Sequence, residues 1–97
     1  MLVSSIAMSP IIEKESINEQ NFEKANHSKE EESIIKQKLF DAMMLGNSAH
    51  HKVHIAFLTD EGTKIVYTTV WATTDNFIIL KGGRYIPIHS ILAIDLD

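Results

Sequence analysis

Apolar residues recur at helical spacing in one segment of the chain, which predicts an amphipathic helix from Lys29 to Leu45. Its apolar stripe has the i, i+4, i+7, i+8 pattern of a helix that packs on a core and consists of Ile35, Leu39, Ala42 and Met43. Ser28 precedes the segment, and Glu31 follows three residues later, which is the spacing of a capping box. Gly46 stands where a glycine in the left-handed conformation ends many helices.

From Lys52 onward the apolar period changes to two, which predicts strands joined by short turns. The predicted strands cover residues 53–58, 63–73, 77–81, 84–88 and 91–96. The second is too long for an average strand, so we expect it to bend sharply and to contribute to two sheets. Gly82-Gly83 suits a tight hairpin, and Pro87 places the fourth strand at a sheet edge because proline has no backbone donor.

One helix followed by five strands predicts a mostly β fold, a small and strongly bent five-stranded barrel with the helix over one end. We expect residues 28–97 to carry this fold. Residues 1–27 show neither apolar period, so we expect a flexible N-terminal arm. A domain of roughly 70 residues buries only about 60% of its unfolded surface. We therefore expect a homo-oligomer that pairs through the free edges of the fourth and last strands.

Composition narrows the class of protein. The 97 residues include 13 acidic and 9 basic side chains and no cysteine. A disulfide scaffold and a cysteine-based zinc site are thereby excluded, and the net charge of -4 disfavours generic binding of polyanions. No apolar run approaches the ~20 residues that cross a bilayer, and the first ten residues lack the basic region of a signal peptide. We expect a cytoplasmic protein that does not associate with membranes.

Side chains suited to catalysis are few. The chain has no G-x-S-x-G motif and no pair of carboxylates in a setting that would separate their pKa values. His50 and His54 would lie about 13 Å apart along an extended strand, too far to share one metal ion. We therefore expect a protein that is not an enzyme and that holds neither a cofactor nor a metal.

Two strings in the predicted strands are similar to segments of a known family. Residues 75–81 read Asp-Asn-Phe-Ile-Ile-Leu-Lys, and residues 86–91 read Ile-Pro-Ile-His-Ser-Ile. They resemble the Sm1 segment, D-x-F-x-I-L-L-K, and the Sm2 segment of the bacterial host-factor (Hfq-type) Sm-like proteins, where a Y-K-H-A-I string supplies an RNA-contacting lysine and histidine. Residues 39–43 look like the end of that family's helix, and residues 53–65 are similar to its first hairpin. The resemblance runs from Leu39 to Ile94.

The resemblance implies an Sm-like or related SH3-like barrel, a ring of subunits and binding of single-stranded RNA with a post-transcriptional regulatory role. The residues that would contact RNA are Asp75, Asn76, Phe77, Lys81, Arg84, Tyr85 and His89. This chain departs from the family in three respects. Ile88 stands in place of the family's lysine, Thr68-Thr69 occupies the bend where the family has a glycine, and no arginine cluster corresponds to the family's basic rim.

Each candidate residue also has a purely structural interpretation. Asp75-Asn76 is typical of a turn in which a side chain bonds the backbone, and the His89 ring suits a bond to a carbonyl. Phe77 and Trp71, the single tryptophan, are residue types more often found in a core. The alternative function is a protein-interaction or structural module that pairs with another protein through the barrel edge and the N-terminal arm.

Overall fold

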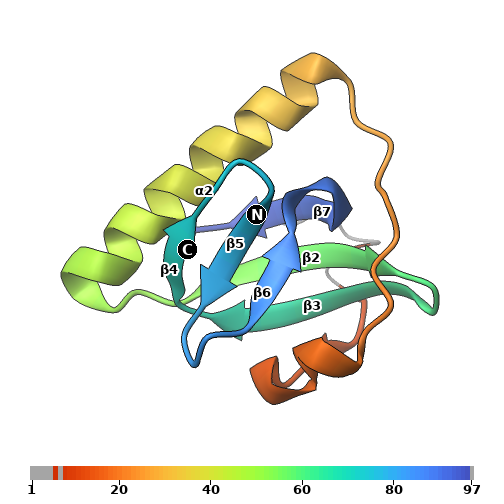
Figure 1. Ribbon diagram of the computed structural model, residues 1–97, viewed down its shortest axis with the longest axis horizontal. Coiled ribbons are helices and arrows are strands. Elements are labelled where there is room, and N and C mark those ends of the chain that lie inside the picture. The colour runs from red at the N-terminus through yellow and green to blue at the C-terminus, as the bar shows by residue number, and fades with distance from the viewer. Residues whose placement is uncertain (1–5, 7, 97) are drawn as a thin grey trace.

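The computed structural model describes residue 6 and residues 8–96, and these residues form one long helix and two sheets (Figure 1). The long helix is α2 (Lys29–Ala49), and two short 3₁₀ helices are η1 (Lys14–Glu19) and η2 (Ile88–Ser90). The strands are β1 (Ile11–Ile12), β2 (Val53–Thr59), β3 (Gly62–Thr68), β4 (Val70–Thr73), β5 (Phe77–Leu80), β6 (Tyr85–Pro87) and β7 (Ile91–Asp95). No helix in the described part of the chain combines the length and apolar character needed to span a membrane.

The strands form a four-stranded sheet in the order β1-β3-β2-β7 and a three-stranded sheet in the order β4-β5-β6. Only Thr69 separates β3 from β4, so one bent segment contributes to both sheets, as the sequence predicts. Pro87 lies in β6, an edge strand, which is also as predicted. Within the described residues β6 and β7 do not pair with each other, and η2 lies between them in the sequence. The fold is mostly strands with one long helix, and no closed barrel is found in this part of the chain.

The bend between β3 and β4 changes which side chains face the core. Thr68, Thr69 and Val70 are all buried, so the alternation of inward and outward residues is interrupted there. A bulge opposite β5 follows between Val70 and Ala72. Trp71 consequently points outward and is 46% exposed. The expectation that Trp71 belongs to the core is therefore wrong.

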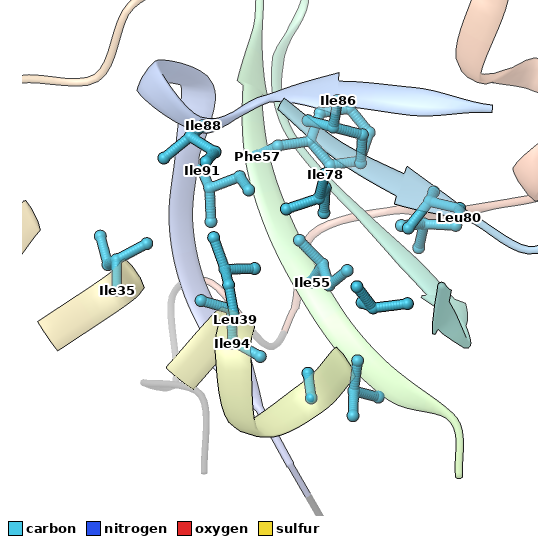
Figure 2. Packing of buried hydrophobic residues seen from close by; sticks show 14 of the residues in the cluster. Ile35, Leu39, Ile55, Phe57, Ile78, Leu80, Ile86, Ile88, Ile91 and Ile94 are labelled. Atoms are coloured by element: carbon cyan, nitrogen blue, oxygen red, sulfur yellow. The ribbon is translucent and has the colours of Figure 1, made fainter. Parts of the chain in front are cut away.

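Apolar side chains, nearly all aliphatic, from α2 and from both sheets form one core (Figure 2). Ile35, Leu39 and Ala42 on α2 are buried, which confirms most of the predicted stripe, and Met43 is partly buried against the same cluster. The sheets contribute Val53, Ile55, Phe57, Val66, Val70, Ile78, Leu80, Ile86, Ile91 and Ile94. Complete burial of a side chain of this size contributes about 1.5–3 kcal/mol, so this cluster accounts for most of the favourable folding energy.

Helix α2 begins as predicted but ends later. The Ser28 hydroxyl accepts a hydrogen bond from the Glu31 amide (3.2 Å), and the Glu31 carboxylate accepts one from the Ser28 amide (3.1 Å), which completes the capping box. Gly46 does not end the helix. The C-cap is His50, which adopts the left-handed conformation (φ 54°). Gly46 is instead buried, because the helix backbone lies directly against the bend at Thr69.

The first 27 residues, predicted as a flexible arm, contact the rest of the fold in the part that is described. Strand β1 pairs in parallel with β3, and Ile17 of η1 is only 1% exposed. Residues 20–27, here called the strap, cross from β2 to η2, with hydrogen bonds from the Glu23 amide to Leu58 and from the Ala25 amide to His89. Isolated anchors such as Ile17 leave no periodic signal, which explains the difference. Residues 1–5 and 7 of the predicted arm lie outside the described residues.

The close approach at Gly46 predicts a large effect of Gly46→Ala. A Cβ there would overlap the carbonyl oxygen of Val70 and would lie 2.8 Å from Cγ2 of Thr69. We expect a loss of about 1–3 kcal/mol in unfolding free energy, larger than the gain of roughly 1 kcal/mol in helix propensity. Chemical denaturation measures it, and the exposed neighbour Asn47→Ala serves as the control. An alanine at 46 as stable as the wild type would contradict this packing.

The packing of η1 predicts that Ile17→Ala destabilises the whole domain. Truncation of a buried isoleucine leaves a cavity and costs about 2–5 kcal/mol. Ile11→Ala, at a position that is 64% exposed, is expected to change stability by less than about 0.5 kcal/mol. Thermal unfolding of the two variants checks this, and equal melting temperatures would show that η1 is detached from the domain.

Candidate nucleic-acid interface

The seven predicted RNA-binding residues lie on or beside β5 and β6, in three groups. The β4–β5 turn and η2 hold Asp75, Asn76 and His89 at one end of these strands. A hydrogen bond from the Ile88 amide to the Asn76 carbonyl (2.9 Å) joins these two segments. Phe77 and Tyr85 lie on the strands themselves, and Lys81 and Arg84 flank the hairpin at the other end.

The first group borders a cleft of about 340 Å³ beneath the start of α2. We call it the helix cleft, and its lining comes from the strap, α2, the β4–β5 turn and η2: Lys24, Ala25, Asn26, His27, Glu32, Ile35, Lys36, Asp75, Asn76, Ile88 and His89. Figure 1 shows the β4–β5 turn beside α2, with the strap crossing to the start of the helix. The structure thus brings together three predicted residues that are up to 14 positions apart in the sequence.

The β4–β5 turn is built differently from the prediction. The Thr74 hydroxyl, rather than the Asp75 or Asn76 side chain, accepts hydrogen bonds from the amides of Asn76 (3.3 Å) and Phe77 (3.0 Å). Both predicted residues are exposed. Because Thr74 maintains the turn, the carboxylate of Asp75 and the amide of Asn76 are left to face the helix cleft.

His89 is exposed, and its ring makes no hydrogen bond within the described residues; only its backbone carbonyl is engaged, by the Ala25 amide at 2.8 Å. The bond predicted for a turn histidine is made by His27 instead. Nε2 of His27 donates to the carbonyl of Ile91 (2.8 Å), and Nδ1 lies 3.7 Å from the Glu31 carboxylate. Nothing local in the sequence marks His27, because its contact is with β7, far away along the chain.

Charges in the helix cleft are nearly balanced. Lys24 and Lys36 supply the cations, and Glu32 and Asp75 the carboxylates, with Lys36 and Glu32 3.2 Å apart. At the cleft's edge, hydrogen bonds from the backbone and side chain of Ser28 hold the pKa of the Glu31 carboxyl below its ordinary value, and His27 adds to the effect. A balanced cleft with an imidazole and an amide suits the polar edge of a base better than it suits a phosphate.

Three aromatic rings are exposed on the three-stranded sheet. Phe77 and Tyr85 contact each other edge to face, with centroids 5.3 Å apart and planes at 84°. They are 40% and 55% exposed, so the structural interpretation of Phe77 as a core residue is wrong. Trp71 on β4 is the third. Phe77 and Tyr85 point outward because inward and outward residues alternate along β5 and β6, whose buried residues Ile78 and Ile86 lie opposite each other.

The hairpin between β5 and β6 forms the basic group. Gly82 and Gly83 both have positive φ (91° and 84°), which other residues rarely adopt. Next to the hairpin is a second hollow of about 390 Å³, the Trp71 hollow, lined by Lys14, Glu15, Trp71, Lys81, Gly82 and Arg84. Lys14 comes from η1, more than fifty positions before Trp71 in the sequence, and no local pattern associates it with this site.

Histidines just before and within β2 make contacts outside the candidate interface. The ring of His54 stacks on the ring of Tyr67 of β3, with centroids 4.2 Å apart, and Nζ of Lys52 lies 5.7 Å from the centroid of the Tyr67 ring. His51 bonds the carbonyl of Leu96 (2.6 Å). Residues 6 and 8–96 contain no cluster of three or more histidines and carboxylates that could hold a metal ion.

Comparisons with known proteins give no relative of this chain. No family model matches it, and no curated protein and no solved structure matches it. The inference of a function therefore depends on how the chain places its own aromatic, basic and polar side chains.

Proposed function

We propose that this protein binds single-stranded RNA and acts in post-transcriptional regulation as an Sm-like barrel protein. The observation that carries the proposal is the exposed pair Phe77 and Tyr85, which lies between a polar cleft and a basic hairpin along the same two strands. Exposed rings on a sheet are stacking platforms for unpaired bases, and the contact is worth about 1–3 kcal/mol per base.

Each group has a distinct role in this proposal. Tyr85 and Phe77 stack on bases. Lys81 and Arg84 contact phosphates at the hairpin. At the other end His89, Asn76 and Asp75 hydrogen-bond base edges or a 2′-hydroxyl, which single-stranded RNA leaves accessible. These residues form a continuous surface from the helix cleft to the Trp71 hollow, here called the strip: Asp75, Asn76, Phe77, Lys81, Arg84, Tyr85 and His89. The strip fits a short stretch of single-stranded RNA rather than a duplex.

The order of strands supports the Sm-like part of the proposal. Paired neighbours follow the sequence β7, β2, the bent β3–β4 segment, β5 and β6. One turn, η2, links β6 to β7. A helix before the first strand, a bent second strand and a one-turn link before the last strand also follow each other in this order in Sm-like barrels. In this arrangement β6 and β7 are the two ends of a bent barrel.

The departure at Ile88 has a structural reason. Ile88 is 6% exposed and belongs to the core cluster, so a lysine at this position would be forced into apolar surroundings. The cations at this end are Lys24 of the strap and Lys36 of α2, which border the same cleft as His89. We propose that they take the place of the family's lysine.

Two of the outer strands, β6 and β7, support association with further copies. Within the described residues β6 pairs only with β5, and β7 only with β2. A β6 edge of one copy placed against a β7 edge of the next would continue the sheet from subunit to subunit, as in a closed ring.

A second candidate function is a protein-interaction module. It is favoured by Phe40 and Met44, two exposed apolar side chains one turn apart on the outer face of α2. Such a face suits an apolar partner surface, whereas the strip on the three-stranded sheet combines rings with cations. Binding of RNA by the strip distinguishes the two candidates.

Tyr85→Ala is expected to weaken RNA binding by about 1–3 kcal/mol through loss of one stacked base. Tyr67→Ala is the matched control, because Tyr67 is similarly exposed but lies on the other sheet. Fluorescence anisotropy with labelled A-rich and U-rich RNA measures both.

The salt dependence of RNA binding tests the role of the hairpin. If Lys81 and Arg84 neutralise two phosphates, the affinity for RNA should fall about sevenfold between 50 and 200 mM salt. Equal effects of Tyr85→Ala and Tyr67→Ala, or no binding of either RNA at low salt, would contradict the proposed function.

The edge pairing predicts a ring in solution. Light scattering of the full-length protein should give a mass about six or seven times the 10.9 kDa of one chain. Nuclease treatment is the control, because a ring held by strand pairing keeps its mass when RNA is digested. A monomer or a dimer at micromolar concentration would contradict the ring.

A further inference from the structure

The Trp71 hollow has a composition that differs from that of the rest of the strip. Three cationic side chains, Lys14, Lys81 and Arg84, surround an exposed indole. One carboxylate, Glu15, faces them, which leaves two positive charges unbalanced in a protein of net charge -4. Two of the cations come from the hairpin and the third from η1, so the cluster depends on the tertiary fold.

The donors of this cluster are only partly used within the protein. Arg84 makes one long hydrogen bond, from Nη1 to the carbonyl of Gly82 (3.4 Å). Its Nε is buried and has no hydrogen-bond partner in the part of the chain that is described. Because the Nε is closed to solvent, an anion in the hollow contacts the terminal nitrogens of the guanidinium, and the one hydrogen bond that these make within the described residues is long. These terminal donors, together with the ammonium groups of Lys14 and Lys81, point to an anionic ligand.

Lys14 and Glu15 set the charge of the hollow. The ammonium of Lys14 lies 2.8 Å from the Glu15 carboxylate. This hydrogen bond lowers the pKa of the Glu15 carboxyl, and Arg84 contributes to the same effect. The Lys14 side chain also passes over the hairpin, since its Cε lies 3.6 Å from where a Cβ at Gly82 would be. Residues of η1 thus close the hollow on the side where the strip of β5 and β6 ends.

We infer that the Trp71 hollow binds a nucleoside monophosphate unit, with the base stacked on Trp71 and a terminal phosphate between Lys81, Arg84 and Lys14. A terminal phosphate carries a charge of about -1.5 to -2 near neutral pH, as judged from phosphorylated side chains, whereas a phosphate inside an RNA strand carries one. The two unbalanced positive charges match the terminal group. The unit reaches the hollow either as the phosphorylated end of an RNA or as a free nucleotide. The inference deepens the proposed RNA binding and depends on it for the first of these sources.

The single tryptophan gives a direct probe of this site. Adenosine monophosphate stacked on Trp71 should quench its fluorescence, and adenosine, which lacks the phosphate, should bind about tenfold more weakly. In parallel, RNA oligomers of one sequence that carry a 5′-phosphate, a 3′-phosphate or hydroxyls at both ends are compared by anisotropy. One phosphorylated RNA should bind about tenfold more tightly than the hydroxyl form.

Glu15→Gln provides a gain-of-function test that does not risk the fold, because Glu15 is exposed. Removal of its charge frees Lys14 and should tighten binding of adenosine monophosphate roughly two- to fivefold. Glu61→Gln is the matched control: it breaks a comparable exposed ion pair, Lys64–Glu61 at 2.7 Å, and changes the net charge equally. Arg84→Ala should reduce the same binding.

The outcomes separate this inference from the proposed function. RNA binding without any preference for a phosphorylated end, together with no quenching by adenosine monophosphate, would overturn the inference and leave the proposed function intact. Quenching by adenosine monophosphate in a protein that binds no RNA would support the hollow as a nucleotide site and overturn the proposed function. Equal effects of Glu15→Gln and Glu61→Gln would attribute the binding to net charge and would contradict the site.

Discussion

The close contact between Gly46 and the bend at Thr69 is the constraint on which the rest of the structure depends. The helix backbone lies against Thr69 and Val70 with no space for a side chain, and the Thr69 hydroxyl donates to the carbonyl of His50 at the end of α2. This contact holds the bent segment where it leaves the four-stranded sheet and begins the three-stranded one. The Lys81 amide bonds the carbonyl of Thr69 (3.0 Å), so the hairpin that carries the basic residues is fixed to the same point. The interruption of the alternation at 68–70 also turns Trp71 outward. The core and the proposed interface therefore share one structural cause.

The elements of the fold could be predicted from the sequence where the signal is local. The period of the apolar residues identifies the helix and the five segments that form strands β2 to β7, and the length of residues 63–73 predicts the bend that divides one segment into β3 and β4. Gly46 shows the limit of this reasoning. A glycine near the end of a helical pattern is compatible both with a C-cap and with close packing on another element. Only the contact with Thr69, which lies more than twenty positions away, distinguishes the two.

The residues of the candidate site could likewise be predicted only where the sequence carries a local signal. The resemblance to the Sm-like segments groups Asp75, Asn76 and His89, and the pairing of β5 with β6 brings the ends of the strands that they flank together. The residue type alone indicates a core position for Trp71, and an alternating pattern does not reveal how the bend changes which residues face outward. Lys14 gives no local signal at all. It reaches the hollow because η1 is anchored by Ile17, a single buried residue in a polar segment.

Segregation of charge explains how an acidic protein can present a site for an anion. The acidic residues of the β2–β3 hairpin lie at the opposite side of the molecule from the β5–β6 hairpin in Figure 1, and the molecule extends about 33 Å along its longest axis. Charges separated by more than the Debye length of about 8 Å at physiological salt are largely screened, so the local cluster, rather than the net charge, determines binding at the hollow. One of its cations belongs to η1. A ligand that binds only when η1 is packed stabilises that packing by mass action, and this couples the N-terminal segment to occupancy of the hollow.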